Sequence, residues 1–98
     1  MTSAFAQIGG ARIGRFNASW PFARLSADRD GIALRCLFFK FTFPRDTITR
    51  LGRYRGFIST GLQVEHAVPR YPGFMLFWTF DFDRLKRELE ALGHTVRD

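Results

Sequence analysis

The sequence predicts a mainly β domain, a small antiparallel barrel or sandwich of six to seven strands that one C-terminal α-helix caps. Three observations predict this class. Apolar residues alternate with a period of two in several short segments between residues 22 and 80. Turn-forming residues, such as Asp-Gly and Pro, separate these segments. From residue 81 onward the apolar spacing changes to three and four, which is typical of a helix with one buried face.

Length and composition fit a single domain over residues 1–98. A chain of 98 residues with 46% hydrophobic and 16% aromatic residues can bury a core of its own. Its one cysteine, Cys36, excludes an intramolecular disulfide and favours a reducing compartment. The N-terminus lacks the pattern of a signal peptide, and no apolar run approaches the roughly 20 residues that span a bilayer. A cytoplasmic protein, or one peripheral to the inner face of the membrane, is therefore expected.

The sequence predicts a β-hairpin around residues 28–31 and a further strand after it. The sequence "DRDG" (28–31) lies between two apolar segments, and Asp-Gly is a strong hairpin signal because glycine accepts a positive φ. Residues 22–27 and 32–37 are therefore expected to pair as antiparallel strands. Pro44 ends the next segment. The phenylalanines that share one face of that segment, and are expected to fill the interior, are Phe39, Phe41 and Phe43.

Three further segments have the composition of strands: "RDTITRLGRYRGF" (45–57), "GLQVEHAV" (61–68) and "FMLFWTF" (74–80). The sequence "VPRYPG" (68–73) forms a loop between the last two. In the first of them, Arg53 and Arg55 share their alternation with the apolar Leu51, which conflicts with a half-buried strand. A bulge at Gly52 is expected to relieve this conflict and to turn both arginines outward.

Residues 81–92 predict the C-terminal helix. Asp81 suits the N-cap, and Gly93 suits the position after the C-cap. Phe80 and Leu85 are expected to form a hydrophobic staple across the N-cap. The apolar stripe that should cover the interior of the barrel consists of Phe82, Leu85, Leu89 and Leu92.

In their order, these segments resemble the pleckstrin-homology-like barrel, including its GRAM-type and bacterial forms. The resemblance covers roughly residues 8–93. It is carried by "FARLSADRDGIALRC", "FTFPRDTITRLGRYRGF", "GLQVEH" and "FMLFWTFDFDRLKRELEALG". It implies a small barrel that acts as an interaction module, and it raises the expectation of a homo-oligomer. The preference for arginine over lysine favours a bacterial origin.

The positive charge lies mainly before the helix. The net charge is +6, and residues 11–80 hold eleven basic and four acidic residues. Arginines can hold phosphate or carboxylate groups bidentately and attract anionic lipid surfaces. The candidates for binding anions or lipids are Arg12, Arg15, Arg50, Arg53 and Arg55. The alternative for Arg50, Arg53 and Arg55 is that they pair with Glu65 or Asp46 on neighbouring strands and keep an exposed face soluble.

Two residues of the loop 68–73 are candidates for contact with a partner. Arg70 and Tyr71 combine a cation with an aromatic ring, a pairing that is enriched at binding hot spots. A plain hairpin loop is the alternative. Aromatic and basic residues also alternate elsewhere in a way that suits single-stranded nucleic acid, but the strand pattern places most aromatic residues in the core.

The sequence predicts neither catalysis nor a cofactor or metal. "GFISTG" (56–61) has one residue too many for a nucleophile elbow, and His66 and His94 are far apart in the chain. His66 is expected to be a hydrogen-bonded histidine of the core or its rim. The predicted function is therefore non-catalytic: protein–protein binding or self-assembly. Peripheral binding of anionic membrane lipid is the alternative, and binding of single-stranded nucleic acid is a second one.

Overall fold

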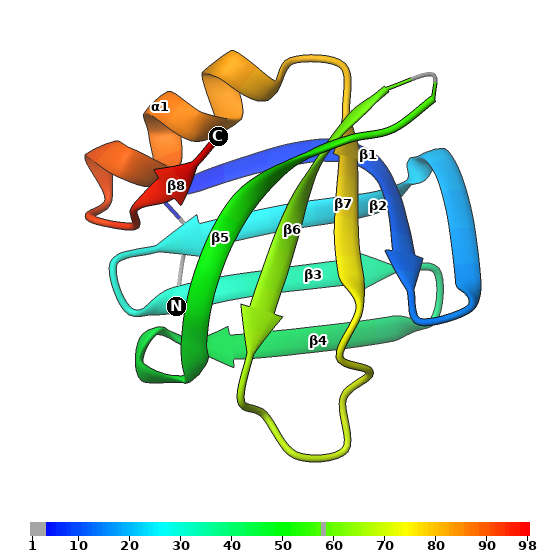
Figure 1. Cartoon of the computed structure of the whole chain (residues 1–98), viewed down its shortest axis with the longest axis horizontal. Coiled ribbons are helices and arrows are strands. Elements are labelled where there is room, and N and C mark those ends of the chain that lie inside the picture. Colours follow the sequence, from blue (N-terminus) through cyan, green and yellow to red (C-terminus); the bar gives the residue numbers. More distant parts are fainter. Residues whose placement is uncertain (1–3, 58) are drawn as a thin grey trace.

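The computed structural model describes residues 4–57 and 59–98, and Figure 1 shows a curled sheet with a helix across its upper end. The elements are β1 (Phe5–Ile13), β2 (Phe16–Asp28), β3 (Gly31–Cys36), β4 (Phe39–Pro44), a 3₁₀ turn (Arg45–Thr47), β5 (Ile48–Arg55), β6 (Thr60–His66), β7 (Met75–Thr79), α1 (Phe82–Ala91) and β8 (Val96–Arg97). The mainly β class with one C-terminal helix is confirmed. The strand number is corrected from six or seven to eight, because β8 is too short to show a pattern.

All strands belong to one sheet in the order β4-β3-β2-β1-β7-β6-β5-β8. Every neighbouring pair is antiparallel except β5 and β8. Figure 1 shows β2, β3 and β4 crossing behind β5, β6 and β7, so the sheet folds over on itself. The sheet bends at β1, where the register with β2 shifts between Gly9 and Ala11. A side chain at Gly9 would overlap the carbonyl oxygen of Trp78, so this bend requires glycine.

The helix covers one end of the folded sheet, as expected. Phe82, Leu85 and Leu89 are buried in the same core cluster as the strand residues. The Asp81 side chain accepts a hydrogen bond from the backbone amide of Arg84 at 3.2 Å, which confirms the N-cap. Gly93 follows the C-cap with φ of 90°. Among the described residues, no helix has the length and apolar character needed to cross a membrane.

The β2–β3 hairpin is confirmed, but glycine has a different role in it from the one predicted. Ala23 pairs with Cys36 and Asp28 with Gly31, and the Asp28 carboxylate accepts from the amides of Asp30 (2.8 Å) and Gly31 (3.0 Å). Gly31 does not have a positive φ. A Cβ there would lie 2.5 Å from the carbonyl oxygen of Phe43, so glycine allows close approach of β4.

The expectation that most aromatic residues lie in the core is wrong. Of the twelve phenylalanines, four are buried: Phe5, Phe43, Phe77 and Phe82. Six are exposed: Phe16, Phe22, Phe38, Phe39, Phe57 and Phe80. Leucine is the most frequent residue of the core cluster, and alanine and these four phenylalanines come next. The phenylalanine face of β4 does exist, but only Phe43 is buried, because Phe39 lies near the hairpin end, beyond the core.

Candidate functional site

Two of the five candidate arginines form ion pairs within the chain. Arg50 lies 3.7 Å from Glu65, on the neighbouring strand β6, which is the partner that the alternative interpretation named. Arg53 lies 3.1 Å from Asp98 and 3.5 Å from Asp83. Its guanidinium also stacks on the Phe82 ring at 4.4 Å. Both side chains are therefore already engaged by groups of this chain.

The predicted bulge at Gly52 is wrong. The register of β5 with β6 shifts between Ile48 and Arg50, and Gly52 pairs regularly with Gln63. Arg53 therefore stays on the same side of β5 as the buried Leu51. The start of α1 covers this side, so the Arg53 side chain is only 21% exposed.

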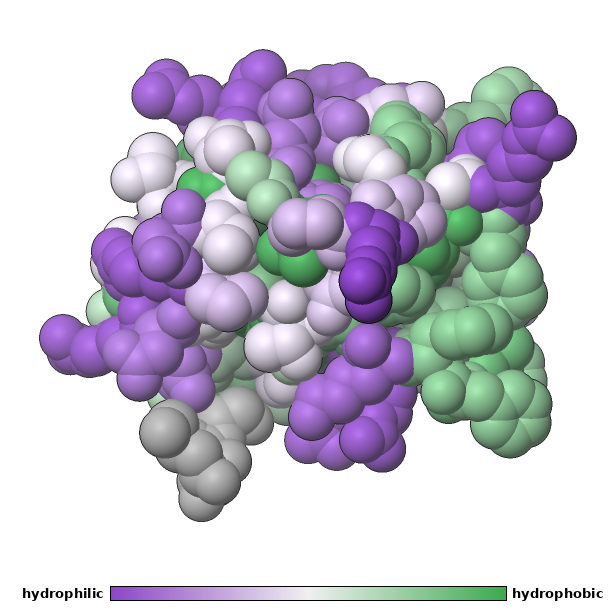
Figure 2. All heavy atoms as spheres, turned by 90° about the horizontal axis from the view of Figure 1, so that it is seen from below, coloured by the Kyte–Doolittle hydropathy of each residue, from purple (hydrophilic) through white to green (hydrophobic). Residues whose placement is uncertain are grey.

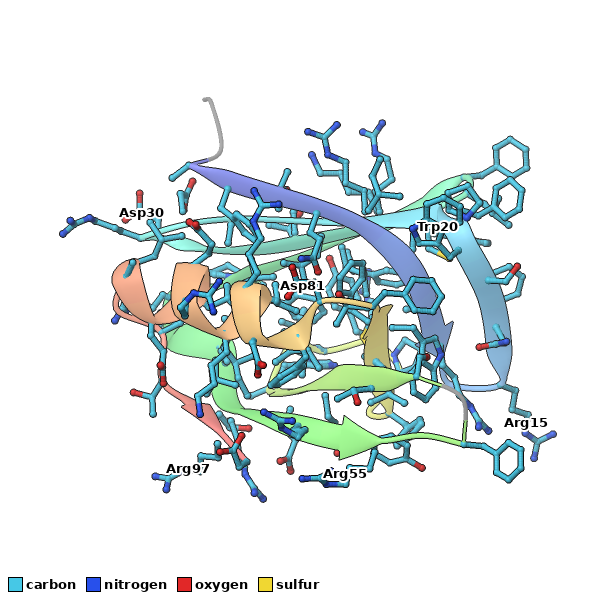
Figure 3. All side chains as sticks on the ribbon, turned by 90° about the horizontal axis from the view of Figure 1, so that it is seen from above. Arg15, Trp20, Asp30, Arg55, Asp81 and Arg97 are labelled. Atoms are coloured by element: carbon cyan, nitrogen blue, oxygen red, sulfur yellow. The ribbon has the colours of Figure 1, made fainter. Side chains whose placement is uncertain are left out.

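The other three arginines come from two hairpins of the sheet. Arg12, on β1, donates from Nε to the carbonyl oxygen of Gly14 at 3.1 Å, and its guanidinium lies 5.4 Å from the Phe74 ring centroid. Arg15 lies in the β1–β2 turn and Arg55 at the end of β5, and Figure 3 shows them well separated. Of the five, Arg12 and Arg50 line two different hollows.

Tyr71 has a structural role between two strands. Its hydroxyl oxygen accepts a hydrogen bond from the backbone amide of Thr42, on β4, at 3.1 Å. Its ring packs edge to face on Phe41 and Phe43 at 5.1 and 5.6 Å. Since β4 ends the sheet, Tyr71 covers part of an open strand edge. Arg70, the other candidate of this loop, is exposed.

His66 is hydrogen-bonded at the rim of the core, as the sequence predicted, and Cys36 packs inside the core. His66 Nδ1 accepts from the Val68 amide at 3.1 Å, and Nε2 lies 2.9 Å from the Pro72 carbonyl oxygen, which fits the Nε2–H tautomer. Cys36 is buried, and this burial raises the pKa of its thiol. Among the described residues, no group of acidic, histidine and cysteine side chains is arranged to hold a metal ion.

A groove of about 500 Å³ lies between β2, the end of β7 and the β5–β6 hairpin. We call it the aromatic groove. Its aromatic residues are Trp20, Phe57, Trp78 and Phe80, and its other lining residues are Arg12, Asn17, Ala18, Ser19, Ser59 and Thr79. No acidic residue lines it. The sequence did not predict this groove, because its walls come from three separate parts of the chain.

Trp78 is held firmly in the groove. Its ring lies against Gly56 and Gly61, where an added Cβ would lie 2.6 and 3.1 Å from the indole. Its Nε1 donates to the Asn17 side-chain oxygen at 3.4 Å. Tyr54 packs edge to face on the indole at 5.9 Å. The indole therefore occupies a space that two glycines leave open, and its position is defined before any ligand binds.

Trp20 and Phe80 form the most exposed part of the groove. Their ring centroids lie 6.4 Å apart in an edge-to-face arrangement, yet Trp20 is 55% and Phe80 76% exposed. Phe80 was expected to form a staple with Leu85. Instead it leaves most of its surface in solvent while Leu85 is fully buried. Trp20 lies in a segment of β2, residues 19–22, that has no ladder partner on β1 or β3.

Three cations lie in register across the outer face of β2, β3 and β4. Arg24 pairs with Arg35, and Arg35 pairs with Lys40. We call these residues the basic row. They line a shallow hollow of about 270 Å³ together with the small residues Ser26 and Ala33. Within the described part of the chain, none of the three forms an ion pair. Like charges directly opposite each other in a sheet are destabilising, so a bound anion would reduce the repulsion among these three side chains.

The basic row adjoins a set of exposed apolar residues, which we call the apolar tip: Ile8, Phe22, Leu37 and the next residue, Phe38. Ile8, Phe22 and Leu37 share a second hollow with two members of the row, Arg24 and Arg35. Figure 2 shows hydrophobic side chains gathered at the right-hand edge, where the β1–β2 and β3–β4 hairpins lie in Figure 1. A large exposed apolar patch on a small protein marks a site of interaction.

The β3–β4 turn beside this tip has a strained backbone. Leu37 has φ of 54°, in the left-handed region where glycine and asparagine are favoured. This conformation costs a leucine about 1 kcal/mol or more. Phe38, the next residue, is fully exposed. Local strain of this kind clusters at functional sites.

Comparisons of the chain with protein-family models, with characterised proteins and with solved structures give no match. The candidate functional surfaces of the molecule are the aromatic groove and the basic row with its apolar tip.

Proposed function

We propose that this protein is a non-catalytic interaction module that binds a protein partner through the aromatic groove. The observation that supports this is the exposure of Trp20, Phe57 and Phe80 around a preformed Trp78. Exposed aromatic side chains leave apolar surface in water, and this surface is a source of binding free energy once a partner covers it. Tryptophan is also enriched among residues that dominate binding energy.

The fold supports the proposal that this interaction module is a pleckstrin-homology-like barrel. Seven antiparallel strands precede a helix that covers one end of the curled sheet, which is the order on which the resemblance to the pleckstrin-homology-like barrel depends. A bacterial cytoplasm remains the proposed location. The single, buried cysteine is in keeping with it.

Site-specific photocrosslinking tests this function. A photoreactive phenylalanine analogue replaces Phe57, which is fully exposed in the groove, and in a matched protein it replaces Arg87, exposed on α1. We expect a defined crosslinked product from position 57 that disappears in a Trp20→Ser background, and none from position 87. Equal labelling from both positions, together with a monomer in sedimentation at high concentration, would contradict the proposal.

A second function is favoured by a separate observation. The basic row and the apolar tip lie side by side, which is the combination that binds an anionic bilayer: cations attract the lipid head groups while apolar side chains enter the interface. This proposal replaces the five arginines predicted from the sequence with Arg24, Arg35 and Lys40. Single-stranded nucleic acid, the second alternative, also needs exposed cations and aromatic rings, and the vesicle experiment in the Discussion separates the two.

A further inference from the structure

We propose that the aromatic groove recognises an extended segment of a partner protein in which an aromatic residue lies beside an acidic residue. This inference rests on the proposed function and deepens it by naming the chemistry of the ligand. It is argued from three features of the groove: its aromatic walls, its charge, and the polar groups along β2.

The aromatic walls of the groove can pack against an aromatic side chain of a partner. Trp20 and Phe80 form one wall, Phe57 stands on the β5–β6 hairpin, and the Trp78 indole lies between them. Aromatic rings prefer edge-to-face or offset contacts with centroids roughly 4.5–7 Å apart, and four rings from three segments of the chain offer several such contacts to one more ring. The groove volume of about 500 Å³ leaves room for a side chain and the backbone that carries it.

The positive charge of the groove favours a ligand with an acidic residue. Among the described residues that line the groove, Arg12 alone is charged. The Arg12 guanidinium is held in place through Nε by the Gly14 carbonyl oxygen and by the Phe74 ring. The described residues give it no carboxylate partner. Its two terminal nitrogens form no hydrogen bond with the described residues, so they can bind a ligand carboxylate bidentately.

The charge also argues against a second copy of this chain as the occupant. Each copy carries a net charge of +6, so two copies repel each other, whereas an acidic segment is attracted to the groove. An acidic partner is therefore the better match to this surface.

The polar groups favour a peptide over a hydrocarbon chain. Residues 18–20 of β2 line the groove, and Gly10 of β1 lies against their backbone. The side chains of Asn17, Ser19 and Ser59 add hydrogen-bonding groups to the lining. An extended peptide presents amide groups that can pair with these, and an acyl chain presents none.

Peptide titration tests the inference. The probes are Ac-Asp-Phe-Asp-Phe-NH₂, its lysine counterpart Ac-Lys-Phe-Lys-Phe-NH₂ and its alanine counterpart Ac-Asp-Ala-Asp-Ala-NH₂. Both tryptophans of the chain line the groove, so intrinsic fluorescence reports occupancy. We expect the acidic aromatic peptide to bind at least about tenfold more tightly than either counterpart, the effect of one charge-assisted hydrogen bond.

Variants assign that preference to the groove. Arg12→Gln should remove the advantage of the acidic over the lysine peptide, and Phe57→Ser should weaken binding of both aromatic peptides by about tenfold. The matched controls are Arg29→Gln, an exposed cation elsewhere, and Phe38→Ser, an equally exposed phenylalanine on another hairpin. Both should bind the peptides as the parent protein does. Circular dichroism establishes that every variant is folded.

The outcomes separate this inference from the proposed function. Equal affinity for the acidic and lysine peptides, or equal losses in variants and controls, would overturn the inference. If the crosslink from position 57 still depended on Trp20, the proposed function would stand and only the ligand chemistry would fall. Sedimentation that shows a dimer sensitive to Phe57→Ser would assign the groove to a second copy and would also overturn the inference.

Discussion

Trp20 and Phe80 pack edge to face with ring centroids 6.4 Å apart, although 60 residues separate them in the chain. The pair links the bend of β2 to the residue before the N-cap of α1. A double-mutant cycle with Trp20→Ala and Phe80→Ala should give a coupling of about 0.5–1.5 kcal/mol in the free energy of unfolding. Urea denaturation measures it. Strictly additive effects of the two substitutions would show that the rings do not pack together in solution.

Gly61 should be a position where one methyl group disturbs the groove. A Cβ there would lie 3.1 Å from the Trp78 ring and 3.3 Å from the Phe77 carbonyl oxygen, so Gly61→Ala must displace the indole. We expect a loss of about 1–3 kcal/mol of stability and a shift of the tryptophan emission. Gly73→Ala is the control, because a Cβ at Gly73 meets nothing within 4 Å. Equal stability of both variants would contradict the packing described here.

The sequence predicted the features that depend on local pattern. The helix stripe, the Asp81 N-cap and the β2–β3 hairpin are each encoded within a dozen residues, and each is present. The burial of phenylalanine was not predictable in this way. Alternation assigns Phe39 and Phe43 to the same face of β4, but whether a residue on that face is buried depends on how far the core extends along the strand.

The two candidate surfaces differ in how far the sequence could predict them. Arg24 and Arg35 lie the same number of residues from Asp28 and Gly31, which pair across the hairpin turn, so this turn fixes them opposite each other. The basic row was therefore within reach of sequence reasoning. The aromatic groove was not, because residues 20, 57 and 78 meet only through the bend of the sheet.

The ion pairs of Asp98 with Arg53 and Lys86 should make the free energy of unfolding depend on pH. A hydrogen bond from Lys86, followed by the charges of Lys86 and Arg53, lowers the pKa of Asp98 below its ordinary value of 3.8. The stabilising contribution is thus fully present above the unfolded pKa and is lost as the pH falls through the lower, folded pKa. Asp98→Asn should be less stable than the parent near neutral pH, and the difference should vanish in strong acid. Because Asp98 is exposed, added salt should shrink the difference, and one that persists at high salt would argue against this origin.

Removal of the basic row should abolish attachment to acidic vesicles. The triple variant Arg24→Gln, Arg35→Gln, Lys40→Gln loses three charges near the surface, each of which contributes about 1 kcal/mol. Partitioning onto phosphatidylcholine vesicles with phosphatidylserine should fall about 100-fold, as measured by co-sedimentation. Vesicles without phosphatidylserine should bind neither protein.

The control removes the same charge elsewhere: Arg29→Gln, Arg87→Gln, Arg97→Gln, all exposed and outside the row. It should keep most of the binding. Equal loss in the control would mean that net charge alone acts, and the basic row would have no special role. A parent protein that ignores the vesicles but binds oligothymidine through the row would assign this surface to nucleic acid instead.

Repair of the strained β3–β4 turn should separate stability from membrane binding. Leu37→Gly with Phe38→Ser places glycine at the position that has φ of 54° and removes the fully exposed ring. The free energy of unfolding should rise by about 1 kcal/mol, because glycine adopts this conformation without steric cost. Vesicle binding should fall at the same time, because the apolar tip no longer enters the bilayer interface. A variant that is more stable and still binds vesicles as the parent does would show that the tip takes no part. A variant that is less stable would show that Leu37 is not strained, and the functional argument from this turn would then be lost.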